Sequence, residues 1–90
     1  MAHTLRNKTK IIARINRIKG QLGALSKALE SDQDCYQNMQ LLSSCRGALN
    51  GLMAEVVEGH IQEHIVEAES KKLAAESGED LIEIMKSFLK

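Results

Sequence analysis

The 90-residue chain has a formal net charge of zero, contains no Pro or Trp, and has one Tyr and one Phe. A chain of this length forms one domain, residues 1–90, with a modest core, so association with further copies is expected. It has no apolar run that could span a membrane and no secretory leader, which predicts a cytoplasmic protein without a membrane partner.

The basic residues are concentrated at the start of the chain. Six of the twelve Lys and Arg residues lie within the first twenty positions, where there is no acidic residue. A basic segment on a neutral chain predicts a surface for a polyanion. The alternative is an ordinary solvated face whose countercharges come from neighbouring segments.

Residues 5–30 are predicted to form the first helix. Its apolar residues follow one another at steps of four and three, as in a helix packed lengthwise against another: Ile11, Ile15, Ile18, Leu22, Leu25 and Leu29. Lys10, Arg14 and Arg17 repeat this spacing one residue earlier, which predicts an exposed basic ridge about 100° from the apolar seam. Gly20 and Gly23 weaken the helix by about 1 kcal/mol each, but the period continues through both.

Residues 31–67 predict a turn and a second helix, with Ser31 and Asp34 as a capping pair. The apolar face of this helix is wide enough to be buried on two sides, which favours a central place in a bundle; it includes Leu42, Cys45, Leu49, Leu52 and Val56. Asn50-Gly51 is a common turn dipeptide, but the apolar period passes through it unchanged. Gly47 and Gly51 are expected to let another backbone approach closely.

His60 and His64 are four residues apart, so on a helix both imidazoles lie on one face and can share a metal ion. Two ordinary solvated histidines are the alternative. Cys35 lies on nearly the same face as His60 but about 37 Å away along the helix, so one chain cannot join them. If two copies of this helix cross antiparallel with their centre between residues 47 and 48, Cys35 of each meets His60 of the other, and the site occurs twice per dimer.

The N-terminus is expected to reach the same site. When the first helix folds back on the second about residue 31 or 32, His3 comes alongside His60 of its own chain. Removal of the initiator methionine would expose the amino group of Ala2 as a further nitrogen donor. The two cysteines, Cys35 and Cys45, are predicted to be thiols rather than a disulfide, because the cytoplasm is reducing.

Residues 69–78 are polar, and their later part is predicted to be a connection that leads into a short third helix. Ser77 and Asp80 form the expected capping signature of this helix. Its apolar residues have amphipathic spacing: Leu81, Ile84, Met85 and Phe88. This helix is expected to cover the bundle near the histidines, in a packing role rather than a chemical one.

Several segments together resemble the copper-sensitive operon repressor family (CsoR/RcnR/FrmR) over almost the whole chain: RINRIKGQLGAL, DCYQNMQLL, and RGALNGLM followed by EVVEGHIQEH. The resemblance implies an all-α, three-helix protomer that forms an antiparallel helical-bundle dimer and a dimer-of-dimers tetramer. The combination of His3, Cys35, His60 and His64 resembles the nickel/cobalt-responsive, RcnR-like branch. It implies that the apo protein binds operator DNA through the first helix, and that metal binding releases the DNA so that an efflux gene is expressed.

The chemistry of the donors agrees with this branch. One thiolate, three imidazoles and an amine suit Ni(II) or Co(II), and also Zn(II), whereas Cu(I) prefers more sulfur. A sixth ligand would come from water, Asp34 or Glu63. Cys45 is outside this motif and is interpreted as a buried core thiol, with a redox role as the alternative.

Two other functions are considered. A formaldehyde- or copper-responsive repressor of the same family is the nearer alternative. A small helical enzyme of the chorismate mutase type would need arginines inside the bundle, whereas Lys10, Arg14 and Arg17 lie off the apolar seam. The prediction is therefore that the chain is not an enzyme.

Overall fold

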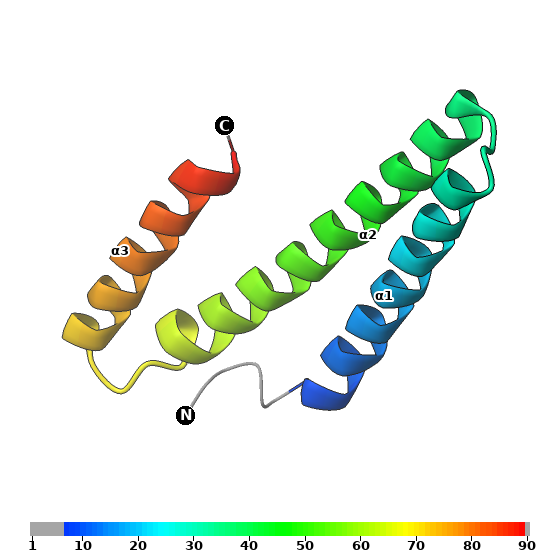
Figure 1. The fold of residues 1–90 in the computed structure, drawn as a ribbon. Coiled ribbons are helices and arrows are strands. Elements are labelled where there is room, and N and C mark those ends of the chain that lie inside the picture. The colour runs from blue at the N-terminus through cyan, green and yellow to red at the C-terminus, as the bar shows by residue number, and fades with distance from the viewer. Residues whose placement is uncertain (1–6, 90) are drawn as a thin grey trace. The chain divides into compact units, whose positions relative to one another are not determined.

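The computed structural model describes residues 7–89. Three α-helices follow one another along the chain, α1 (Lys8–Glu30), α2 (Cys35–Ile61) and α3 (Lys71–Phe88), and a π-helical turn, η2 (Gln62–Val66), continues α2 (Figure 1). Within the described residues there is no strand, so the predicted all-α fold is confirmed. Residues 8–54 form one compact unit, and residues 55–89 belong to another.

A short turn joins α1 to α2. Asp32 has a φ of 56°, a left-handed conformation that Asp tolerates better than most residues. The Ser31 hydroxyl donates to the Ala28 carbonyl at 3.2 Å and so closes the end of α1. Asp34 Oδ1 accepts a hydrogen bond from the Tyr36 N–H at 3.3 Å, at the first turn of α2. The predicted capping pair is therefore corrected, because Asp34 caps the second helix while Ser31 bonds back to the first.

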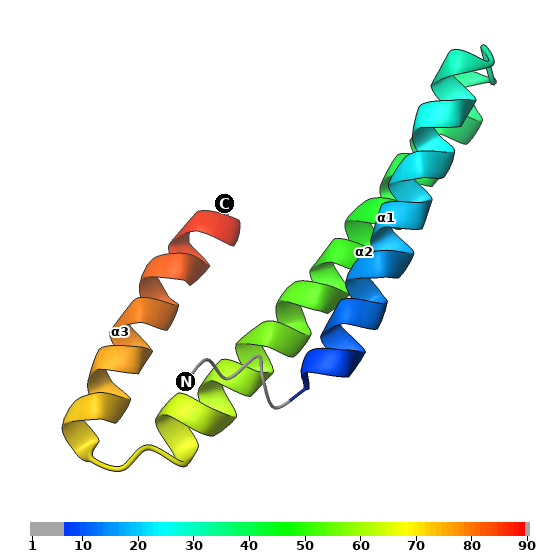
Figure 2. The same cartoon turned by 60° about the horizontal axis from the view of Figure 1, so that its bottom comes forward.

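α1 lies antiparallel beside the part of α2 that precedes residue 55, and both views show this pairing (Figures 1 and 2). The side chains buried in this hairpin are Ile11, Ile18 and Ala28 of α1 and Cys45 of α2. Cys45 is only 2% exposed, which supports its interpretation as a core thiol. Along the same contact, Gln21 Nε2 donates to Ser44 Oγ at 3.4 Å.

Only half of the predicted α1 seam is covered within the hairpin. Ile15, Leu22 and Leu29 are 39%, 47% and 59% exposed, although the seam predicted that they would be packed. They lie on the flank of the covered face, where one neighbouring helix does not reach. In α2, Leu42 and Leu49 are likewise 56% and 48% exposed beside the buried Cys45. The apolar stripe of each helix is thus wider than a two-helix contact can cover.

The glycines inside the two long helices do not interrupt them. α1 runs through Gly20 and Gly23, and α2 runs through Asn50-Gly51, as the unchanged apolar period predicted. Both helices therefore keep their register along the hairpin.

The third helix begins earlier than predicted. Ser70 Oγ accepts a hydrogen bond from the Leu73 N–H at 3.1 Å and caps α3 at its first turn. Gly78 consequently lies inside α3, and the capping role predicted for Ser77 and Asp80 is wrong. A good N-cap followed by the strong helix formers of KKLAAE outweighs the cost of one interior glycine, about 1 kcal/mol.

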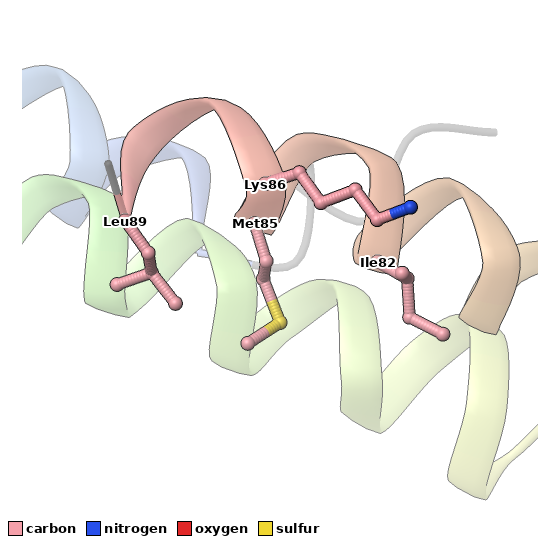
Figure 3. Close-up of a pocket in the computed structure, with 4 residues that line it drawn as sticks. All are labelled: Ile82, Met85, Lys86 and Leu89. Carbon is pink, nitrogen blue, oxygen red and sulfur yellow. The ribbon is translucent and has the colours of Figure 1, made fainter.

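The later part of α3 carries an apolar surface. Ile82, Met85 and Leu89 point to one side of the helix, and the Lys86 side chain runs along it (Figure 3). Ile82 and Leu89 are both more than half exposed. None of the described helices is long and apolar enough to cross a membrane.

The buried contact between α1 and α2 can be tested with two isoleucines of one helix. Ile18 is 5% exposed and Ile12 is 45% exposed. We expect Ile18→Ala to lower the free energy of unfolding by about 2 to 5 kcal/mol, because it removes buried methyl groups and leaves a cavity. Ile12→Ala should cost less than about 1 kcal/mol. Urea unfolding followed by circular dichroism at one protein concentration measures both, and equal losses would contradict the described packing.

Candidate functional site

The three residues of the predicted basic ridge do not have equivalent surroundings. Lys10 and Arg17 are exposed, whereas Arg14 is half-buried. An added Cβ on Gly51 would overlap the Arg14 Nη1 atom and lie 3.6 Å from its Cζ, so the guanidinium rests against α2 at this glycine. The ridge is therefore an exposed pair with a central arginine turned toward the neighbouring helix.

The prediction that Gly47 and Gly51 admit the backbone of another helix stays a prediction for a second copy of the chain, since within the described residues neither glycine has another backbone against it. A side chain, that of Arg14, occupies the space over Gly51. Around a Cβ added at Gly47, nothing lies within 4 Å. The two glycines thus differ although they are one helical turn apart.

The predicted histidine pair is brought together. His60 lies in the last turn of α2 and His64 in the η2 turn, with ring centroids 5.2 Å apart and ring planes tilted by 50°. The Glu67 N–H donates to the Gln62 carbonyl at 3.0 Å, a bond that spans five residues rather than four. Nothing in the sequence indicated this wider turn, which changes the direction of the His64 side chain relative to a regular α-helix.

α3 contacts His60 directly. His60 Nε2 lies 3.0 Å from the main-chain carbonyl oxygen of Ser77. Because a carbonyl oxygen only accepts, Nε2 carries the proton, and the lone pair of the neutral ring is on Nδ1. Histidines that bind metals commonly donate their other ring N–H to a carbonyl or carboxylate in this way. The prediction that the third helix lies near the histidines is confirmed, but its role there is more than packing.

Sequence reasoning missed Ser77 as part of this site. Its contribution is a main-chain oxygen, which every residue type possesses, so no residue pattern could have identified it. Only the earlier start of α3, set by the Ser70 cap, brings that carbonyl to His60.

Acidic side chains surround His64. A surface pocket beside it is lined by Glu63, Glu67, Glu69, Leu73 and Ser77, among others. Oxygen Oε2 of Glu63 is buried and has no hydrogen-bond partner among the described residues. Imidazoles suit divalent transition metals, but Glu63 does not complete a group of three donors with the two histidines.

The other predicted ligands are not gathered at this point of the chain. Cys35, the first residue of α2, is an exposed free thiol. Ala2 and His3 lie outside the described residues. Within residues 7–89 no group of three or more His, Cys, Asp or Glu side chains could hold a metal ion. The described part of one chain therefore offers a histidine pair that fits a metal but needs further donors.

Comparison with known proteins identifies the family. A family model described as a metal-sensitive transcriptional repressor matches residues 7–88. The chain is 39% identical over 90 residues to the transcriptional repressor RcnR of Citrobacter koseri and to that of Salmonella typhimurium, with all of each chain covered. It is 44% identical over 91 residues to an uncharacterized protein in the bioA 5′ region of Serratia marcescens, again over the whole of both chains.

A solved structure has the same fold. It is a glutamate-to-histidine variant of the formaldehyde-responsive regulator FrmR from Salmonella enterica serovar Typhimurium. The TM-score is 0.85 and the sequence identity 36%, with 92% of this chain and 94% of that chain covered. The family model and RcnR are both described as transcriptional repressors rather than enzymes, so the prediction that the chain is not an enzyme is confirmed. The chain belongs to the metal-sensitive transcriptional repressor family that includes RcnR and FrmR.

Proposed function

We propose that this repressor responds to Ni(II) or Co(II) in the cytoplasm: it binds operator DNA without metal, releases it when metal binds, and so allows a metal efflux gene to be expressed. Residues 1–90 act as one domain that both senses the metal and binds the DNA. The full-length similarity to RcnR and the nitrogen-rich set of candidate ligands support this function. Zn(II) is a further candidate ion.

The observation that carries the proposal is a seam along α2 that is exposed from Cys35 to Met53 and half-buried at Val56 and His60. Its members follow at alternating steps of four and three, so they share one face of the helix: Cys35, Met39, Leu42, Arg46, Leu49, Met53, Val56 and His60. Met39 and Leu42 in this seam are 57% and 56% exposed. An exposed apolar stripe of this length, with one charge in it, is typical of a surface that another helix covers.

The same seam is symmetric about its own centre. An antiparallel crossing between residues 47 and 48 places Leu42 opposite Met53 of the partner subunit and Arg46 opposite Leu49 of the partner subunit. The ends of the seam, Cys35 and His60, then meet across the two-fold axis. The seam residues and the candidate ligands therefore favour the same antiparallel dimer. We propose that two such dimers form a tetramer.

The proposed metal site combines donors from both subunits. His60 would bind through Nδ1, whose lone pair is fixed by the bond from Nε2 to the Ser77 carbonyl. His64 is its neighbour, Cys35 comes from the partner subunit, and His3 with the amino group of Ala2 comes from the start of the same chain. A bound divalent ion would draw these donors together and so change the position of the first helix.

The proposed DNA surface is the basic part of α1. Lys10 and Arg17 are exposed on this helix, and Arg14 lies between them in sequence. Cationic side chains of this kind bind phosphates and release counterions, which makes the affinity dependent on salt. The DNA-bound and metal-bound forms compete, because the two ligands favour different positions of α1.

A formaldehyde-responsive function is the second candidate, since the similar solved structure is a variant of a formaldehyde-responsive regulator and Cys35 is an exposed thiol. The deciding experiment uses fluorescence anisotropy with a duplex from upstream of the protein's own gene. Ni(II), Co(II), Zn(II), Cu(I) and formaldehyde are added separately to the preformed complex. We expect release by Ni(II) and Co(II); release by formaldehyde or Cu(I) alone would overturn the proposed specificity.

The DNA surface is tested by Lys10→Ala and Arg17→Ala. Each should weaken operator binding for any DNA sequence and reduce the slope of log affinity against log salt by about one, because one phosphate contact is lost. Lys27→Ala, at an exposed position near the other end of α1, is the matched control. If all three variants bind like the wild type over a range of salt concentrations, α1 does not contact the DNA.

The shared metal site is tested by mixing two inactive variants. Cys35→Ala and His60→Ala homodimers should each lack a complete site and fail to respond to metal while still binding DNA. In a mixed dimer both lesions fall in one site, so the other site is intact, and Co(II) absorption should reveal it. A mixture without any tight Co(II) site would contradict the antiparallel arrangement.

The coupling of metal to DNA is tested by His3→Ala. This variant should still bind metal through the remaining donors, but it should release DNA poorly, because the first helix is no longer drawn toward the site. Coupling between two ligands is typically worth about 1 to 3 kcal/mol, and it is the same whichever ligand is measured. Metal affinity and operator affinity are therefore measured on the same variant. Full release of DNA at metal saturation would show that His3 is only a ligand.

A further inference from the structure

Arg14 occupies a position on α1 that belongs to the packed face rather than to the exposed ridge. It lies one turn from Ile11 and one turn from Ile18, both of which are buried in the hairpin. It is half-buried, whereas Lys10 and Arg17 are exposed. Its long side chain crosses to α2, where the guanidinium lies over Gly51. The central charge of the basic segment is thus held by the neighbouring helix.

Gly51 is distinct from the other glycines of the hairpin. A Cβ added at Gly20, Gly23 or Gly47 would have no neighbour within 4 Å, so at those positions nothing in the described chain requires a glycine. At Gly51 the added atom would overlap Arg14 Nη1. A glycine inside a helix is unfavourable relative to alanine, and here the missing Cβ leaves the space that the guanidinium occupies.

We propose that Gly51 is a positioning residue for DNA binding. Because it has no Cβ, it leaves a space on α2, here called the seat, that holds the Arg14 guanidinium in one orientation. The proposal rests on the proposed function of α1 as the DNA surface. A flexible Arg side chain loses rotamer freedom when it binds a phosphate. An Arg side chain that is already held in the seat has lost much of that freedom beforehand, so its binding costs less conformational entropy. The planar guanidinium is also directional, so its orientation matters more than that of a Lys ammonium.

Gly51→Ala removes the seat without removing the arginine. The added methyl group meets the far end of a flexible side chain, which can move away while the two helices stay together. Gly23→Ala is the matched control, since it makes the same substitution in the other helix of the hairpin, where there is open space and which lies away from the proposed dimer axis. Both variants should gain helix propensity, so a difference between them reports on Arg14.

The functional test is a double-mutant cycle of operator affinity on the full-length protein. We expect Gly51→Ala to weaken binding at least about threefold in the wild-type background and to have no effect in the Arg14→Ala background, because contacting residues are coupled. Gly23→Ala should bind like the wild type in both backgrounds. The proposal is overturned if Gly51→Ala and Gly23→Ala bind alike, or if Gly51→Ala weakens binding equally with and without Arg14.

A second measurement examines the seat without DNA. In ¹⁵N-resolved NMR spectra, the Arg14 Nε–H signal should be shifted and slow to exchange in the wild type and in Gly23→Ala, but not in Gly51→Ala. An unchanged signal in Gly51→Ala would refute the seat. If the seat is present while neither Arg14→Ala nor Arg17→Ala changes operator affinity, it is the proposed DNA surface that fails, so the two failures are distinguishable.

Discussion

Two helices lying side by side can cover only one flank of each other, and the rest of this structure depends on that constraint. In the hairpin of α1 and α2, the apolar stripe of each helix is wider than the contact between them. Ile18 and Cys45 are buried, while Leu22 and Leu42, on the adjoining flanks, are about half exposed. Few of the described side chains are buried, so the uncovered flanks favour the assembly proposed above.

The uncovered flank of α2 would serve both dimer formation and metal binding. The seam that would bury Leu42 and Met53 against another copy begins at Cys35 and ends at His60. Under the proposed symmetry, the surface that stabilises the dimer is the surface that completes the metal site. Changes in packing along this seam would then alter metal affinity even where no ligand is touched, because both properties depend on the same alignment of two helices.

The sequence predicted long elements and local pairs well, and it failed where a feature depended on tertiary contacts. The unbroken spacing of apolar residues correctly predicted that the helices continue through Gly20 and Gly51. The spacing of His60 and His64 correctly predicted that their rings lie close together. The spacing of apolar residues in α1 does not say how much of its apolar face α2 covers. Ile15 and Leu29 were therefore predicted to be packed, whereas they are exposed. Arg14 was predicted to lie on the exposed ridge, but it is one turn from both Ile11 and Ile18, and the spacing alone did not say which flank of the apolar seam α2 covers.

The contact between α3 and His60 is made by a peptide carbonyl, which no side-chain substitution at residue 77 deletes. Other residue types at this position would present the same acceptor, as long as the helix keeps its place. What can alter the contact is a shift of α3 along its own axis, by a fraction of the rise per residue of about 1.5 Å. The tautomer of His60, a proposed metal ligand, is thereby tied to the placement of a whole helix.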